Sequence, residues 1–252
     1  MRKITDNMEM PGYGEDLAYI HDAGFRDYAL KAAPGLLGIL GRSGIRSGLV
    51  VDLGCGSGRL AAELNRAGYE ALGVDQSPAM IQLARRIAPA AQFKIGSLLT
   101  VRIPPCDALT SIGECVNYLF DRRNSRKALS RLFRRVHRAL KPGGVFVFDF
   151  ADPGRLAKRL PQKSWVEGDD WAVLVSTEGD PSRQLLRREI TCFRKAGKLF
   201  RRSQETHVLR LYRARDLEQD LERCGFQVRI AGSYGGFHLP TGIRVIVAHK
   251  SG

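Results

Sequence analysis

The chain has 252 residues, of which 44% are hydrophobic. A chain of this length buries roughly 70–75% of its unfolded surface in one domain with an insertion, so a stable core is expected. Residues 1–12 contain no apolar stretch, and no run elsewhere approaches the ~18 apolar residues of a membrane span. The sequence therefore predicts a cytoplasmic protein without a membrane segment.

The net charge of +14 and the pI near 10.0 raise the possibility of an acidic partner such as RNA. The charge is spread evenly, because residues 1–150 carry 21 basic and 14 acidic side chains and residues 151–252 carry 19 and 12. No segment forms a basic tail. A nucleic-acid substrate therefore remains an alternative and is not the leading prediction.

Five cysteines stand at positions 55, 106, 115, 192 and 224, and no two of them form a CxxC pair. An odd number of cysteines without such spacing argues against a disulfide framework and against a zinc site. We expect reduced thiols and no bound metal.

Short β-rich runs alternate with amphipathic stretches between residues 49 and 150, which is typical of a parallel sheet covered by helices on both faces. The expected strands are Leu49–Leu53, Ala71–Asp75, Gln92–Ile95, Ala108–Ile112 and Gly144–Phe150. A helix is expected over residues 122–140. Its outer face carries Arg131, Arg134, Arg135 and Arg138, which we predict to be solvated.

Beyond residue 150 the pattern changes to extended runs at 172–177, 185–194 and 199–211, with a hairpin turn at 195–198. These runs predict an antiparallel insertion, in which Trp165 and Trp171 are expected to form a small hydrophobic core. A helix over residues 215–224 ends at Gly225, and strands at 226–231 and 244–249 return the chain to the main sheet.

A glycine-rich turn follows the first strand, where Gly54, Gly56 and Gly58 alternate with other residues. Such a turn lets the backbone approach a ligand closely and opens a helix with free N–H groups. A dinucleotide fingerprint would need Gly or Ala at the sixth place of GxGxxG, and here Arg59 and Leu60 follow Gly58. The pattern therefore indicates a nucleotide-like ligand that need not carry a pyrophosphate.

Asp75 ends the second strand, seventeen residues after Gly58. A carboxylate there is placed to accept hydrogen bonds from both hydroxyls of a ribose. The alternative is that Asp75 only caps the next helix. Ser77 already supplies a cap for that helix, and Pro78 suits its first turn.

Four ordered blocks carry a resemblance to a known family: VVDLGCGSG, LGVDQSPAMIQLAR, PPCDALTSIGE and LKPGGVFVFDF. Together they resemble the class I S-adenosylmethionine-dependent methyltransferases. The resemblance implies an α/β fold, a Rossmann-like, mostly parallel and doubly wound sheet of seven strands with an antiparallel β insertion after the fifth strand. It also implies S-adenosyl-L-methionine as cofactor. The expected cofactor-binding residues are Asp52, Gly54, Cys55, Gly56, Asp75, Gln76, Ser97, Leu98 and Glu114.

One departure from the family pattern lies after the third strand. Many relatives place there an acid that accepts from the adenine amino group, whereas this chain has Gly96-Ser97-Leu98. Ser97 or a backbone carbonyl is expected to substitute for that acid.

The second half resembles the small-molecule N- and O-methyltransferases, whose inserted strands commonly form a lid over the acceptor. The implied organisation is an N-terminal helical lid segment (1–47), a cofactor-binding core (48–150), the antiparallel lid (151–213) and a C-terminal part that completes the sheet (214–252). The expected substrate-pocket residues are Tyr13, Tyr19, His21, Asn117, His207 and Arg210.

Methyl transfer from a sulfonium is an in-line displacement, so the protein mainly aligns the reactants and excludes water. A general base is needed only if the acceptor must first lose a proton, and Glu114 and His207 are the candidates. Residues an odd number apart on a strand face opposite sides, so we expect His207 to face inward and Arg210 outward unless a bulge re-aims it.

The leading hypothesis is a methyltransferase for a small molecule, as a monomer or homodimer. The alternatives are an RNA or protein methyltransferase and a non-catalytic cofactor-binding protein on the same fold.

Overall fold

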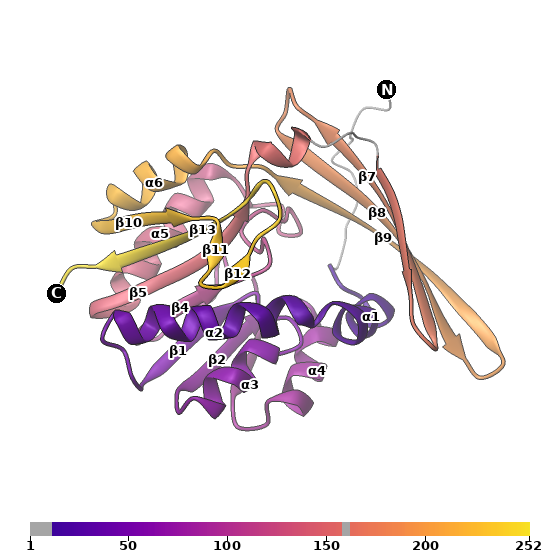
Figure 1. Ribbon diagram of the computed structural model, residues 1–252, viewed down its shortest axis with the longest axis horizontal. Coiled ribbons are helices and arrows are strands. Elements are labelled where there is room, and N and C mark those ends of the chain that lie inside the picture. The colour runs from indigo at the N-terminus through magenta and orange to yellow at the C-terminus, as the bar shows by residue number, and fades with distance from the viewer. Residues whose placement is uncertain (1–11, 158–161) are drawn as a thin grey trace.

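The computed structural model describes residues 12–157 and 162–252. The predicted segments 1–47 and 151–213 are therefore described in part, since residues 1–11 and 158–161 lie outside the described ranges. The described chain contains one large sheet with helices on both faces and a second sheet that projects to one side (Figure 1).

The large sheet has seven strands in the order β10-β13-β5-β4-β1-β2-β3. Its strands are β1 (Leu49–Leu53), β2 (Glu70–Asp75), β3 (Gln92–Ile95), β4 (Cys106–Ser111), β5 (Leu140–Ala151), β10 (Phe226–Ala231) and β13 (Ile243–Lys250). The strands from β3 to β5 pair in parallel, and β13 pairs antiparallel with both β5 and β10. This arrangement confirms the predicted fold class.

The helices form two layers. One face carries α2 (Asp27–Arg42), α3 (Arg59–Arg66) and α4 (Pro78–Ile87), and the other carries α5 (Arg126–Ala139) and α6 (Ala214–Glu222). Strand side chains alternate between the two faces, so Val50 and Ala108 pack under α2 and α3 while Val51 and Leu109 pack under α5. All parallel strand ends that carry candidate site residues therefore meet at one edge.

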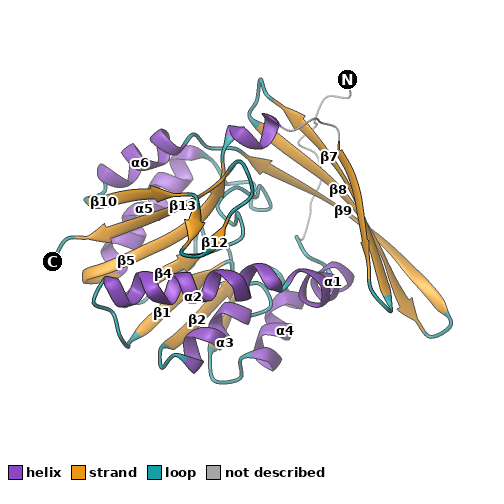
Figure 2. Cartoon of the chain, viewed as in Figure 1, coloured by secondary structure: helices purple, strands orange, loops and turns teal. Residues whose placement is uncertain are grey.

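The antiparallel insertion is a four-stranded sheet, here called the lid sheet, with strands β6 (Gln162–Glu167), β7 (Trp171–Asp180), β8 (Leu185–Ala196) and β9 (Leu199–Arg210). Figure 2 shows these strands as long ribbons that extend past the main sheet. The expected pairing of Trp165 with Trp171 is wrong. Trp171 is buried against Leu17 and Ile20, whereas Trp165 faces solvent on the outer side of the lid sheet with 66% of its surface exposed.

Helix α1 (Glu15–Phe25) lies between the lid sheet and the main domain (Figure 1). A short hairpin of β11 (Ser233–Tyr234) and β12 (Phe237–His238) packs on α2, and a 3₁₀ helix, η1 (Pro153–Ala157), follows β5. In the described ranges no helix is both long enough and apolar enough to span a membrane.

The basic helix α5 begins at Arg126, four residues later than expected, because the side chain of Ser125 caps it by accepting from the N–H of Ala128. Arg131, Arg134 and Arg138 are exposed, as predicted for a solvated face. The prediction is wrong for Arg135, which is half-buried and donates hydrogen bonds to the carbonyls of Leu99 and Val101. Arg135 therefore fixes the loop after β3.

Candidate active site

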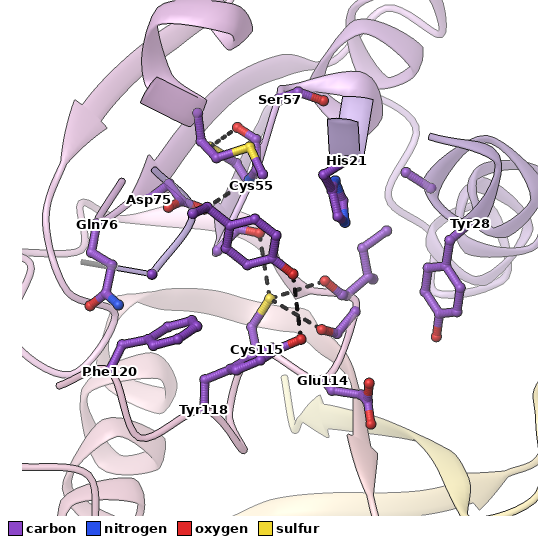
Figure 3. Close-up of a pocket in the computed structure, with 18 of the residues that line it drawn as sticks. His21, Tyr28, Cys55, Ser57, Asp75, Gln76, Glu114, Cys115, Tyr118 and Phe120 are labelled. Carbon is purple, nitrogen blue, oxygen red and sulfur yellow. Dashed lines mark hydrogen bonds between the residues drawn. The ribbon is translucent and has the colours of Figure 1, made fainter. Parts of the chain in front are cut away.

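A cavity of about 460 Å³ opens at the carboxyl edge of the parallel strands, beneath α1 and the lid sheet. Figure 3 shows Asp75 and Gln76 on one side of this cavity and His21 and Tyr28 on the other. Eleven of the predicted site residues line it, namely Tyr13, His21, Asp52, Gly54, Cys55, Gly56, Asp75, Gln76, Ser97, Leu98 and Glu114. The structure thus brings together the residues expected at the cofactor with part of the expected substrate pocket.

The glycine-rich turn forms one wall of the cavity. A side chain would be unfavourable at Gly54 and at Gly56 for different reasons. Gly54 has φ +81°, and a Cβ there would lie 2.5 Å from the Cys115 sulfur. Gly56 has φ +52°, and a Cβ there would meet no protein atom within 4 Å. Because Gly56 also lines the cavity, a side chain at this position would enter the space left for a ligand.

Asp75 closes the turn from the end of β2. Its two carboxylate oxygens accept hydrogen bonds from the N–H groups of Gly56 and Ser77, each at 2.9 Å. The Ser77 hydroxyl accepts from the N–H of Met80 and caps α4, so the cap of that helix comes from Ser77, as expected, while Asp75 also bonds the backbone just before the helix. Burial raises the pKa of Asp75, and the backbone donors oppose that shift.

Asp52 at the end of β1 is 1% exposed and accepts a hydrogen bond of 2.7 Å from the Thr110 hydroxyl. Burial raises the pKa of its carboxyl to about 7. A nearby ammonium would favour the ionised form, so this carboxyl is suited to receive a positively charged amino group.

A carboxylate from a distant part of the chain reaches the loop after β3. The Ser97 hydroxyl donates to the Asp121 carboxylate at 2.5 Å, and both residues line the cavity. Burial raises the pKa of Asp121, but hydrogen bonds from Arg123 and Ser97 outweigh it and hold the pKa at about 2. Sequence reasoning missed Asp121 because it lies in the loop before α5, far from β3 along the chain.

Glu114 follows β4 in a strained loop, with φ +61° at a residue that is not glycine. The carboxylate of Asp149 fixes this loop by accepting from the N–H groups of Gly113 and Glu114, at 2.8 and 2.5 Å. The hydroxyls of Tyr28 and Tyr234 donate to the same carboxylate, at 2.7 and 3.0 Å. Asp149 is therefore a buried hub that holds the Glu114 loop in place.

The Glu114 carboxylate pairs with Arg188 of β8 at 3.1 Å, which joins the main sheet to the lid sheet. Arg188 also donates to the Tyr118 hydroxyl at 3.2 Å, and the hydroxyls of Tyr118 and Tyr13 lie 3.5 Å apart. Burial lowers the pKa of Arg188, but the charge of Glu114 outweighs it and holds the pKa above its usual value. Arg188 was not predicted, although it shares a strand face with the buried Leu186 and Ile190.

His207 faces inward, as predicted, yet it does not line the cavity. It is 1% exposed, and its Nε2 lies 2.9 Å from a carboxylate oxygen of Glu205. That carboxylate accepts from the N–H groups of Tyr13 and Gly14, so it holds the residues that lead into α1. Burial lowers the pKa of His207 even though Glu205 raises it. The geometry thus gives His207 a structural contact and none to the acceptor space.

Three other predicted pocket residues also lie outside the cavity lining. Asn117 is fully buried and bonds the backbone of Ala151 and Arg210. Arg210 donates to the carbonyl of Asn124 at 3.3 Å, and the Tyr19 hydroxyl donates to Asp170 at 2.8 Å. Asn117 and Arg210 thus join the lid sheet to the main domain, and Tyr19 joins α1 to the lid sheet.

Helix α1 is tied to the glycine-rich turn by Asp22. Its carboxylate accepts from the Ser57 hydroxyl at 2.7 Å and pairs with the Arg59 guanidinium at 2.7 Å. The Ser77 hydroxyl donates to the carbonyl of Tyr13 at 2.6 Å. The α1 segment therefore covers the cavity directly over the turn.

The family model described as a methyltransferase domain matches residues 50–144. The methyltransferase YqeM of Bacillus subtilis is 26% identical over 188 residues, which cover 72% of this chain and 74% of that protein.

The family match covers the stretch of the chain that contains the glycine-rich turn and Asp75. The predicted enzyme class, an S-adenosylmethionine-dependent methyltransferase, is thereby confirmed.

Two solved structures share the fold over nearly the whole chain. An S-adenosylmethionine-dependent methyltransferase from Clostridium acetobutylicum has a TM-score of 0.79 and 21% identity, and the match covers 93% of this chain and 98% of that one. The sugar N-methyltransferase KedS8 from a Streptoalloteichus species has a TM-score of 0.76 and 20% identity, with 98% and 97% covered. The lid sheet is included in these matches, since they extend well beyond residues 50–144.

Proposed function

We propose that this methyltransferase transfers the methyl group of S-adenosylmethionine to a nitrogen or oxygen of a small-molecule acceptor. The observation that carries the proposal is a single cavity of about 460 Å³ whose walls run from the glycine-rich turn to the inner face of the lid sheet. Cavities of this size suit small ligands. A sugar N-methyltransferase among the structural matches supports the same class of acceptor.

The residues present fit the cofactor at the main-sheet end of the cavity. In this proposal Asp75 accepts hydrogen bonds from the ribose hydroxyls, and Asp52 binds the amino group of the methionine part. The open space above Gly56 accommodates the part of the cofactor that lies against the glycine-rich turn. Ser97 and Asp121 form the polar pair nearest the expected adenine end. S-adenosylmethionine, when bound, supplies a methyl group activated on a sulfonium.

The chain itself contributes alignment and exclusion of water. Helix α1 and the lid sheet cover the cavity, with apolar contact from Leu17, Val173 and Ile190. His21 lines the cavity, and its Nδ1 is buried without a hydrogen-bond partner among the described residues. Burial lowers the pKa of His21 to about 4, so the ring is neutral at pH 7 and Nδ1 is free to accept a hydrogen bond from an acceptor hydroxyl or amine.

The test is release of S-adenosylhomocysteine by the purified full-length chain in the presence of a metabolite library, with an RNA pool and a peptide pool as parallel arms. We expect turnover with members of the metabolite library and none with the two pools. Asp75→Ala is the matched negative control, since it removes the acceptor for the ribose. Turnover with RNA or peptide alone would refute a small-molecule acceptor, and failure of S-adenosylhomocysteine to bind in calorimetry would refute the cofactor site.

A further inference from the structure

Four arginines line the cavity, and one of them, Arg59, is paired with Asp22 of α1. Arg188 comes from the lid sheet, Arg155 from the 3₁₀ helix after β5, and Arg26 from the exposed end of α1. Four carboxylates also line the cavity: Glu114 is paired with Arg188, Asp121 with Arg123, and Asp52 and Asp75 lie in strands β1 and β2. Among the described residues, none of these four carboxylates forms an ion pair with Arg155.

Arg155 is the arginine whose charge is not answered within the described chain. Its Nε is buried and has no hydrogen-bond partner among residues 12–157 and 162–252. The carboxylate nearest to it in sequence, Asp152, is used by the N–H of Gly154 at 2.7 Å and by Arg244 at 3.2 Å. The backbone around Gly242 packs tightly on Arg155, since a Cβ on Gly242 would lie 2.4 Å from the backbone nitrogen of Arg155. The base of the side chain is thus held against a wall beside the cavity.

We propose that the methyl acceptor carries a carboxylate and that Arg155 binds it, with Arg188 contributing a second positive charge to the lining of the same cavity. This inference rests on the proposed function. A buried guanidinium nitrogen without a partner is costly, and the planar fork of N–H donors matches a carboxylate in two parallel hydrogen bonds. The uncharged His21 and the apolar lid residues leave the arginines as the groups that select by charge.

The opposite assignment is an ammonium acceptor held by Glu114. The geometry disfavours it because Arg188 lies 3.1 Å from that carboxylate and would repel a second cation. The two assignments make opposite predictions for one variant. Glu114→Gln removes a negative charge beside the anion site, so it should strengthen binding of a carboxylate and weaken binding of an amine.

The first experiment measures binding rather than turnover. The full-length chain is saturated with S-adenosylhomocysteine, whose binding is checked by calorimetry, and ligand-observed NMR then compares matched probes. Each pair is a hydroxy or amino carboxylic acid and its primary amide, such as hydroxyphenylacetate and hydroxyphenylacetamide. We expect the acids to bind at least about tenfold more tightly than their amides, the scale of a charge-assisted hydrogen bond.

Arg155→Gln should abolish this preference while S-adenosylhomocysteine binds as in the parent. Arg138→Gln is the matched control, because it removes the same charge from an exposed position on α5 outside the cavity. Equal binding of acids and amides, no binding by either, or an acid preference that survives in Arg155→Gln would each overturn the inference. So would Glu114→Gln if it weakened the acids. Loss of S-adenosylhomocysteine binding in the parent would instead refute the proposed function, so the two failures are distinguishable.

Discussion

Replacing Gly56 by valine should abolish cofactor binding while leaving the fold intact. Gly56 has φ +52° and no protein atom within 4 Å of an added Cβ, so the new side chain meets only the space of the cavity. The backbone cost of a side chain in the left-handed region is about 1–2 kcal/mol. For a domain of this size that cost lowers Tm by about 2–4 °C per kcal/mol.

Gly68 provides the control for the backbone cost. It has φ +87°, an added Cβ there also meets no atom within 4 Å, and it lies in the turn between α3 and β2, outside the cavity lining. Gly68→Val should therefore lose a comparable amount of stability and bind S-adenosylhomocysteine normally. Gly56→Val should lose binding by well over tenfold, a change of more than about 1.4 kcal/mol.

The assay is calorimetric titration with S-adenosylhomocysteine, with thermal unfolding of each variant measured in parallel. Gly56→Ala forms the intermediate step of the series, because it adds a single methyl group to the same space. Equal affinities for Gly56→Val and Gly68→Val would refute the reasoning, since the turn would then not lie under the ligand. A Gly56→Val chain that fails to fold would contradict the open space above Gly56.

Three further predictions concern buried polar groups. The ionised form of Asp52, whose pKa is about 7, attracts the ammonium group of the cofactor, so the affinity for the cofactor should fall as the pH drops through about 7. Binding at pH 7 should release up to about half a proton, and calorimetry in buffers of different ionisation enthalpy measures both quantities. His207→Ala should destabilise the chain by about 1–3 kcal/mol and speed hydrogen exchange at the start of α1, because the Glu205 carboxylate that holds this segment loses its contact with the imidazole. A fall in turnover of about 10²-fold with unchanged hydrogen exchange would instead identify His207 as the general base. Asp149→Asn should raise the KM for the acceptor while the affinity for the cofactor is preserved, because an amide cannot accept from all four of the donors that the Asp149 carboxylate now binds. An unchanged KM would contradict the role of Asp149 in holding the Glu114 loop.

Strands β1 and β3 begin and end where the sequence predicted them. Strand β1 is a buried apolar run between Gly48 and Gly54, and such a run is legible without tertiary contacts. Strand β3 is mostly exposed at the edge of the sheet, so burial does not explain its prediction. Strand β6 was missed because Gln162–Glu167 is exposed along its whole length and shows no alternation of burial. Its place in the lid sheet depends on pairing with β7, which no local pattern reveals.

Helix α2 illustrates a second limit. It contains Pro34 and three glycines, which locally favour a break. One of these, Gly35, is needed because a Cβ there would lie 2.2 Å from the carbonyl oxygen of Tyr234. The hairpin that supplies Tyr234 lies about two hundred residues away in sequence, so the reason for the glycine is visible only in the fold.

The same contrast between local and long-range information applies to the candidate site. Gly54, Gly56 and Asp75 could be placed from the sequence because one strand, one turn and the next strand end bring them together in about 25 residues. The other lining residues come from segments that lie far apart in the sequence, among them α1 and β8. The alternation of β9 correctly put His207 on the inner face without showing what that face covers. The alternation along β9 gives the direction of the His207 side chain and puts Glu205 on the same face, whereas the segment that covers this face depends on the three-dimensional position of α1.

Helix α1 is what makes the two ends one site. On the main-sheet side its Asp22 binds Ser57 and Arg59, and on the lid side its Asp16 pairs with Arg201. Acidic residues of α1 thus meet basic residues of both neighbours. Since the cavity is bounded by the turn, α1 and the lid sheet together, any displacement of α1 breaks polar contacts on both sides at once. The contacts that hold the cofactor cradle and those that shape the acceptor space are therefore coupled through a single helix.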